Sequence, residues 1–248
     1  MDALRAILHR NAIRFTRLDC VNDPDEGASS DMPATATTVF VSCWTAEVRE
    51  SIPLWSLYAG GMGGVRIGFP AGFLAGQYIN TGHFKREPIT RLQKGVVIAR
   101  RGGQMADVTP HVWGPARLLY ADDEKRLRPK VHMPSRACRR YDLLRVGLIK
   151  KRYWSFEAEW RYRVFAVADG LMYPLKQSES DWVEQYVDLV NWPVDVRHID
   201  VPLREGVWEN VHIVMGPRAN INKRREVESM LAHYDHGTEV SASSIRIR

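Results

Sequence analysis

The sequence predicts an α+β fold, in which one or more mixed, mostly antiparallel sheets are flanked by helices. Segments with strand character outnumber those with helical periodicity, and their spacing does not follow a repeated strand–helix unit. A hydrophobic share of 45% with a charged share of 26% is typical of a globular protein. We expect a single domain over residues 1–248, with residues 80–135 as a candidate variable insertion.

In the first half, the expected strands span residues 12–16, 39–44 and 65–69, and the expected helices span residues 2–11 and 54–59. The second strand is rich in β-branched and aromatic residues, which favour pleated structure. Pro53 suits the first turn of a helix, and the glycines at 60–64 end it. The polar residues 22–27 form a turn, because Asn and Asp close local hydrogen bonds and Pro fixes φ.

In the second half, the expected strands span residues 117–120, 196–201, 211–215 and 244–248. A helix is expected from about residue 135, because Ala137, Tyr141, Leu144 and Leu148 recur at helical spacing. The basic residues 150–152 would complement the negative end of its dipole. A last helix is expected after a cap at Asn222.

The stretch 154–165 combines a regular pattern with many charges. At a period of two, its aromatic and apolar residues fall on one face, and the charged residues Glu157, Glu159, Arg161 and Arg163 fall on the other. This predicts a half-buried strand. Its charged face is either a solvated ladder of ion pairs or the wall of a site.

Charge and cysteine content limit the function classes. The formal net charge is +6, which favours anionic partners such as nucleotides or nucleic acid. The three cysteines lack metal-ligand spacing, which argues against a disulfide framework or a zinc site, and Cys43 is expected in the core. Without a signal peptide or apolar span, we expect a cytoplasmic protein with no membrane partner, although a secreted effector would have the same features.

The two glutamates of the charged strand permit three kinds of chemistry. Glu157 and Glu159 would bind a metal, perform acid–base work on a glycosidic bond, or stabilise a ribose-centred cation. The metal use requires another carboxylate, which Asp23 or Glu26 would supply. Arg161 and Arg163 instead favour an anionic substrate, because a guanidinium holds phosphate in a bidentate fork.

The ordered motifs of the chain resemble the bacterial domain-of-unknown-function family 2971. They begin with Arg14-Phe15 and an N-D-P-x-E string at 22–26, followed by V-S-C-W at 41–44 and L-W-S-L-Y-A at 54–59. Lys151 and Trp154 then precede the glutamates of a W-x-x-E-x-E-W-R string, and V-M-G-P follows at 214–217. The resemblance is weakest across residues 80–135. Asp25 replaces a phenylalanine that the family often has, which would make the loop more acidic and less anchored.

A looser resemblance is to ADP-ribosyltransferases, which place an Arg or His, then a Ser or Tyr, then a Glu in chain order. Here Arg14, Tyr58 and Glu159 occur in that order. The resemblance implies that Arg14 binds NAD, Tyr58 stacks on nicotinamide, and Glu159 stabilises the ribose cation while Glu157 orients the acceptor. The further candidates for NAD binding are Ser42, Trp55 and Arg161, and those without an assigned role are Asn22, Asp23, Glu26, Lys151 and Trp154.

The resemblance therefore implies an enzyme that uses NAD as a substrate and transfers ADP-ribose to an unknown protein or nucleic-acid acceptor. A toxin, an effector or a phage-defence protein would use such chemistry, and an antitoxin or immunity protein would be its partner. Two alternatives remain open. One is a non-catalytic module that binds nucleotides or nucleic acid, and the other is a metal-dependent nuclease using Asp23, Glu26, Glu157 and Glu159.

Overall fold

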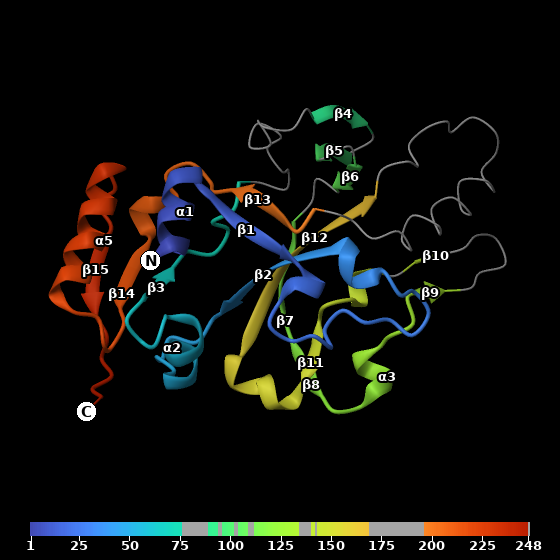
Figure 1. Cartoon of the computed structure of the whole chain (residues 1–248), viewed down its shortest axis with the longest axis horizontal. Coiled ribbons are helices and arrows are strands. Elements are labelled where there is room, and N and C mark those ends of the chain that lie inside the picture. The colour runs from blue at the N-terminus through green and yellow to red at the C-terminus, as the bar shows by residue number, and fades with distance from the viewer. Residues whose placement is uncertain are drawn as a thin grey trace. The chain divides into compact units, whose positions relative to one another are not determined.

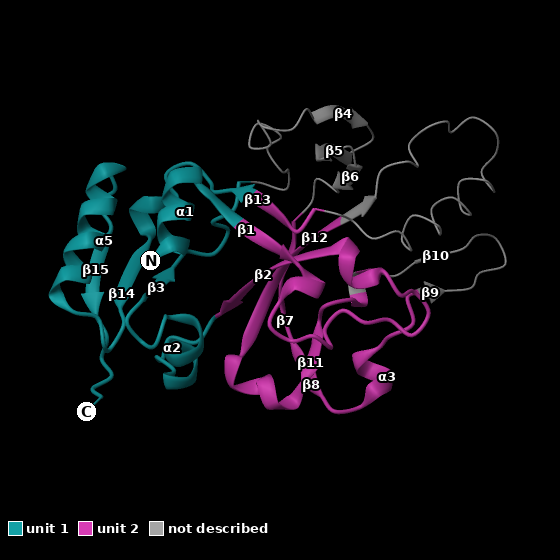
Figure 2. Ribbon diagram, viewed as in Figure 1, with its two compact units in different colours: residues 1–13, 46–76, 201–248 teal, residues 14–45, 77–200 magenta. Residues whose placement is uncertain are grey.

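The computed structural model describes residues 1–75, 89–93, 96–101, 104–108, 112–133, 140–141, 143–168 and 196–247. The chain forms two compact units, shown in Figure 2: unit 1 comprises residues 1–13, 46–76 and 201–248, and unit 2 comprises residues 14–45 and 77–200. Each unit is assembled from segments that are distant in sequence, so no linker marks the division. The mixture of helices and mostly antiparallel sheets confirms the predicted α+β class.

In its described residues, unit 1 contains three α-helices and a three-stranded sheet. The helices are α1 (Asp2–Arg10), α2 (Ile52–Tyr58) and α5 (Ile221–His233). The sheet has the order β15 (Glu239–Ala242), β14 (His212–Met215) and β3 (Val65–Gly68), and a short 3₁₀ turn, η6 (Val207–Asn210), precedes β14. β14 pairs with β15 in parallel and with β3 antiparallel. None of the helices in the described residues has the length and apolar character needed to span a bilayer.

Side-chain caps fix where two helices of unit 1, α2 and α5, begin. Ser51 Oγ accepts a hydrogen bond from Leu54 N, and α2 has proline in its first turn, as predicted. α5 is capped by Asn220, whose Oδ1 accepts from Lys223 N at 2.9 Å, so the predicted cap at Asn222 is wrong by two residues. The predicted strand at 244–248 is also wrong, because the last strand ends at Ala242.

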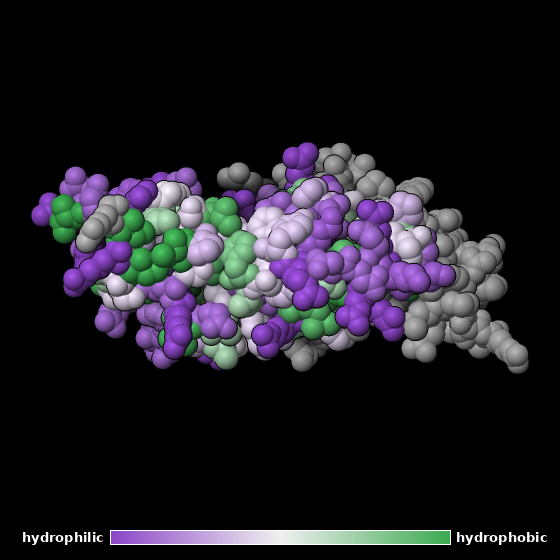
Figure 3. Space-filling model, turned by 90° about the horizontal axis from the view of Figure 1, so that it is seen from below, coloured by the Kyte–Doolittle hydropathy of each residue, from purple (hydrophilic) through white to green (hydrophobic). Residues whose placement is uncertain are grey.

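In Figure 3, hydrophobic residues gather over unit 1 at the left, and hydrophilic residues predominate over the described surface of unit 2.

Among the described residues, the largest sheet has eight strands, which are labelled in Figure 1. Of these, β2, β4 to β7 and β12 lie wholly in unit 2. The path of the sheet is β13 (His198–Pro202), β1 (Ala12–Arg17), β2 (Val39–Thr45), β12 (Glu159–Ala168), β6 (Gln104–Val108), β5 (Val96–Arg101) and β4 (Ile89–Gln93). β7 (Trp113–Arg117) also pairs with β12. β12 pairs antiparallel with β2 along seven residues, and this pairing positions the candidate site.

The other elements in the described part of unit 2 are short. β8 (Leu119–Ala121) pairs in parallel with β11 (Ile149–Lys151), and β9 (His132–Met133) pairs antiparallel with β10 (Arg140–Tyr141). The one short α-helix described in unit 2 is α3 (Glu124–Leu127). The 3₁₀ turns are η1 (Leu18–Cys20), η2 (Thr35–Thr38), η4 (Leu143–Arg145) and η5 (Arg152–Glu157). The helix predicted from residue 135 is wrong where the chain is described, because β10, η4 and β11 occupy that stretch. The predicted strand at 117–120 is divided between β7 and β8.

The hydrophobic core of unit 2 lies against one end of β2 and β12. Val39, Val41 and Phe165 are on the sheet, and the residues that pack with them are Leu18, Met32, Val131, Leu143 and Val146. Val41 and Arg163 are paired across the two strands and lie on the same face, so the core continues directly into a charged region.

The stretch 154–165 is not one strand. Residues up to Glu157 form η5, Ala158 has φ of 44° in the left-handed region, and β12 begins only at Glu159. The predicted alternation holds along β12, but its charged side is the buried one: Glu159, Arg161 and Arg163 are at most 4% exposed. Phe156, which was expected to face the core, is 38% exposed, because the 3₁₀ turn breaks the period of two before the strand starts.

Candidate functional site

Five charged side chains are buried together in unit 2. We call them the charge cluster, and its members are Glu26, Lys150, Glu157, Glu159 and Arg161. Each is at most 5% exposed, and Arg161 is fully buried. With every group ionised, three carboxylates face two cations. Charged residues are almost never buried unless they are paired, so the pairing decides what this cluster can do.

Four different segments supply the cluster. β12 contributes Glu159 and Arg161, which lie two residues apart and therefore share a face. β11 contributes Lys150, and the end of η5 contributes Glu157. Glu26 comes from the predicted turn at 22–27, which the structure confirms. Within that turn Asp23 is buried, and its Oδ1 accepts a hydrogen bond from Asp25 N at 3.0 Å.

Arg161 joins two of the carboxylates. Its Nε donates to Glu159 Oε1, and its Nη2 lies 3.1 Å from Glu159 Oε2. Nη2 also donates to Glu26 Oε2 at 2.9 Å and lies 2.8 Å from Glu26 Oε1, although that contact lacks hydrogen-bond geometry. Nη1 donates to the carbonyl of Gly147 at 3.2 Å. The guanidinium is thus used inside the protein and not on its surface.

Lys150 joins the third carboxylate to the cluster. Its Nζ lies 2.6 Å from Glu157 Oε2 and 3.3 Å from Glu159 Oε2, so the ammonium separates two like charges. The same Nζ lies 4.5 Å from the centre of the Trp154 ring, within cation–π range. Burial alone would lower the pKa of Lys150, but Glu26, Glu157 and Glu159 outweigh it and raise that pKa. Lys150 therefore stays protonated and does not act as a nucleophilic amine.

The same network sets the protonation of the carboxyl groups. Burial acts to raise the pKa of Glu159, but Arg161, the Cys43 thiol and Lys150 outweigh it, and the pKa is lowered. Burial raises the pKa of Glu26, and Arg161 opposes this shift without cancelling it. Glu159 is therefore an ionised carboxylate at neutral pH. Glu26 accepts a proton more readily than Glu159 does.

The cluster reaches the surface beside Cys43. This residue pairs with Arg161 across β2 and β12, lies on the face of the cluster and is exposed, so the expectation of a core position is wrong. Desolvation by the surrounding protein raises the pKa of its thiol, and Glu159 and Glu26 add to the shift against the opposing effect of Arg161. The thiol is therefore a poor candidate for a thiolate nucleophile.

Arg14 and Ser42 lie on opposite faces of the sheet. Thr16 pairs with Val41, and Arg14 and Cys43 lie two residues beyond that pair, which places Arg14 on the cluster's face. Arg14 is exposed, and its Nε lies 3.5 Å from Asp200 Oδ1. Ser42 is on the other face, where its Oγ accepts a hydrogen bond from Trp44 Nε1 at 2.8 Å.

The remaining candidates fall into two groups. Lys151 is half-buried, and its Nζ lies 2.5 Å from Asp25 Oδ2. This ion pair anchors the acidic loop, which Asp25 was expected to make less anchored. Asn22, at the start of the same loop, is exposed. Trp55 and Tyr58 belong to unit 1. Trp55 is only 4% exposed and donates its Nε1 to Glu50 Oε2 at 2.9 Å, so its indole is packed inside unit 1. Tyr58 is exposed on α2.

The sequence reasoning missed Lys150 and Tyr120. Lys150 was interpreted as the charged end of a helix, but it lies in β11 and pairs in register with Tyr120 of β8. The Tyr120 hydroxyl accepts a hydrogen bond from Glu159 N at 2.9 Å. Because β8 and β11 are about thirty residues apart in sequence and pair only through tertiary contact, no local pattern identifies either residue.

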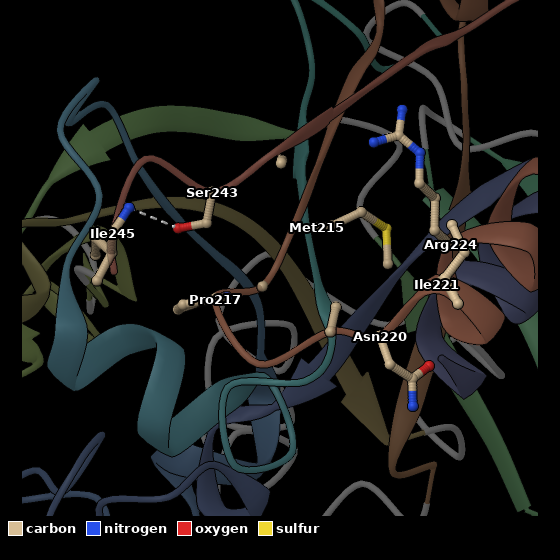
Figure 4. A pocket seen from close by; sticks show the side chains of 10 residues that line it. Met215, Pro217, Asn220, Ile221, Arg224, Ser243 and Ile245 are labelled. Carbon is tan, nitrogen blue, oxygen red and sulfur yellow. Dashed lines mark hydrogen bonds between the residues drawn. The ribbon is translucent and has the colours of Figure 1, made fainter. Parts of the chain in front are cut away.

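Unit 1 contains a separate cavity of about 250 Å³. Figure 4 shows it at the start of α5, with Met215, Pro217, Asn220, Ser243 and Ile245 around it. Met215, Gly216 and Pro217 of the V-M-G-P motif line it. None of the residues that were predicted for NAD binding lines it.

Among the described residues, no group of three or more His, Cys, Asp or Glu side chains is arranged to hold a metal ion. Three of the four carboxylates that the nuclease hypothesis requires are instead bound by Arg161 and Lys150, namely Glu26, Glu157 and Glu159. Comparison with known proteins finds no match: no family model, no curated protein and no solved structure is similar to this chain.

Proposed function

We propose that this protein is an ADP-ribosyltransferase-like enzyme that cleaves NAD between nicotinamide and ribose and transfers ADP-ribose to an acceptor. The observation that carries the proposal is the state of Glu159. Its carboxylate is ionised and held by Arg161 and Lys150 at the first residue of β12, beside the exposed Cys43. A fixed, ionised carboxylate is what a ribose-centred cation requires.

The reaction assigns a specific task to this carboxylate. When the glycosidic bond breaks, its electron pair leaves with nicotinamide and positive charge develops at C1′ of the ribose. Glu159 stabilises that charge, and the acceptor then attacks C1′ and loses its proton. Because the carboxylate is oriented before the reaction, it costs little reorganisation as the charge appears.

The neighbouring residues act through Glu159. Arg161 and Lys150 are positioning residues, because they keep the carboxylate ionised and fixed. Glu157 is bound to Lys150 and is the second carboxylate near the acceptor. Arg14 is exposed on the same face of the sheet and is the residue that we assign to a phosphate of NAD.

A non-catalytic nucleotide-binding module has less support. That alternative depends on Arg161 and Arg163 for phosphate binding. Both are buried, and both donate to protein acceptors: Arg161 to Glu26, Glu159 and Gly147, and Arg163 Nη1 to the carbonyl of Val146 at 2.9 Å. Holding phosphate would require these contacts to break, at the cost of leaving buried carboxylates without their cation.

The test is turnover of labelled NAD by the full chain, with cell extract as the source of acceptors. We expect Glu159→Gln to reduce nicotinamide release by about a hundredfold to a thousandfold, the usual effect of removing one electrostatic stabiliser. Glu239→Gln is the matched control, because it makes the same substitution at an exposed carboxylate of unit 1 outside the cluster. Equal rates for wild type and Glu159→Gln, or no NAD turnover by folded protein, would contradict the proposal.

A further inference from the structure

Tyr120 has a hydrogen-bond donor that the described part of the chain does not use. Its oxygen accepts from Glu159 N at 2.9 Å, and because a backbone N–H only donates, the phenol proton must be directed elsewhere. Tyr120 is half-buried beside the carboxylates, and burial together with Glu159 and Glu157 raises the pKa of its hydroxyl. The phenol therefore keeps its proton at neutral pH.

Trp154 presents a second donor of this kind. Its Nε1 atom is buried and has no hydrogen-bond partner among the described residues. An orphaned buried N–H is rare in proteins, because leaving the donor unsatisfied destabilises the fold. The residue as a whole is partly exposed, so this buried donor lies close to the protein surface.

Both donors border the same lysine. Tyr120 pairs with Lys150 across β8 and β11, and the Trp154 ring lies 4.5 Å from Lys150 Nζ. Lys150 in turn contacts Glu157 and Glu159. Two unused donors from different elements thus lie around a pair of carboxylates: Tyr120 of β8 and Trp154 of η5.

This combination selects a particular ligand chemistry. The negative carboxylates would repel an anion. The positive charge of Lys150 would repel a metal ion, and the two N–H and O–H donors cannot coordinate one. A hydroxyl group satisfies both the donors and the carboxylates, since it accepts from a phenol or indole and donates to a carboxylate. We propose that Tyr120 and Trp154 form a hydroxyl-binding subsite for a sugar, and, resting on the proposed function, that its ligand is the ribose next to nicotinamide in NAD.

Two probes test the subsite in the full-length protein. The first is D-ribose, followed through the indole Nε1–H NMR signal of Trp154, which Trp154→Phe assigns by removing it. We expect ribose to shift this signal, because the free N–H acquires an acceptor. No shift at saturating ribose would overturn the subsite, whatever happens with NAD.

The second probe is NAD binding by calorimetry in a Glu159→Gln background, where turnover is expected to be about a hundredfold to a thousandfold slower. Loss of one hydrogen bond at Tyr120→Phe should raise Kd about fivefold to tenfold. Tyr153→Phe is the matched control, because Tyr153 is an exposed tyrosine of η5 and should leave Kd unchanged. Equal Kd values for the two variants would overturn the assignment of Tyr120.

The two proposals fail separately. If ribose shifts the Trp154 signal and wild-type protein does not turn over NAD, the sugar subsite stands and the transferase reaction does not. If NAD is turned over and neither Tyr120→Phe nor Trp154→Phe alters its binding, the reaction stands and the subsite is rejected.

Discussion

Arg161 Nη2 lies 2.8 Å from Glu26 Oε1 and joins β12 to a loop 135 residues earlier in the chain. Both side chains are at most 1% exposed. Water therefore does not screen the pair, and neither charge has an alternative partner in solvent. The contact makes the N-D-P-x-E loop and the W-x-x-E-x-E-W-R strand parts of one structure.

Replacing Arg161 should destabilise unit 2 severely. Arg161→Met keeps much of the side-chain volume but leaves Glu26 and Glu159 buried without their main cation, and breaking such a pair costs about 3–5 kcal/mol. The free energy of unfolding in guanidinium chloride measures this loss.

Arg14→Met is the control for that substitution. Arg14 makes the same type of ion pair, with Asp200, but its side chain is 45% exposed. Exposed pairs contribute about 0–1 kcal/mol, so the control should remain near wild type. Similar losses in the two variants would mean that burial of Arg161 does not determine its contribution.

The strands were the most predictable part of the fold. Residues 39–44 and 65–69 are bounded by turn residues and rich in β-branched and aromatic side chains, and both form strands close to the predicted bounds. The period of two along β12 was also predicted. The choice of the buried face was not, because alternation fixes which residues share a face, while the partner element fixes which face is covered.

The site was predictable only in part. Glu157, Glu159, Arg161 and Glu26 were identified from local motifs, and the structure brings all four together. Lys150 was missed because the spacing of Tyr141, Leu144 and Leu148 imitates a helix, whereas β11 forms by pairing with the distant β8. Local periodicity carries no information on such pairing.

Gly216 should not tolerate a side chain. A Cβ at this position would lie 2.3 Å from the carbonyl oxygen of Met62. The two backbone segments are held together by hydrogen bonds from Gly216 N to Gly64 O at 2.8 Å and from Arg218 N to Met62 O at 3.1 Å. We expect Gly216→Ala to destabilise unit 1 by about 1–3 kcal/mol, as overpacking does. Thermal unfolding compares it with Gly237→Ala, whose Cβ would meet no atom within 4 Å. A larger loss of stability in Gly237→Ala than in Gly216→Ala would contradict the predicted clash.

Glu50 should make the stability of unit 1 depend on pH. Burial acts to raise its pKa, but hydrogen bonds from Ser243, Ser244 and Trp55 outweigh it and lower the pKa to about 2. A depressed pKa in the folded state means that ionised Glu50 stabilises the fold above its unfolded pKa of about 4.3. That contribution is lost as pH falls from about 4.3 towards 2.

Urea unfolding between pH 7 and pH 2 tests this dependence. Glu50→Gln has no charge to lose, so we expect it to be less stable than wild type at pH 7 and to approach wild type near pH 2. Glu239→Gln, at an exposed residue of β15, is the matched control and should show no such convergence. A constant difference between wild type and Glu50→Gln across the whole range would mean that the network does not stabilise the ionised form.

Cys43 should react slowly although it is accessible. Desolvation and the nearby Glu159 and Glu26 raise the pKa of its thiol, and only the thiolate attacks an alkylating reagent. With iodoacetamide at pH 7.4, we expect Cys43 to be modified more slowly than Cys20, which is also exposed and serves as the internal reference in mass spectrometry. Glu159→Gln removes one of the negative charges and should accelerate labelling of Cys43 relative to Cys20. Labelling of Cys43 as fast as Cys20 in wild type would show that the carboxylates do not suppress the thiolate.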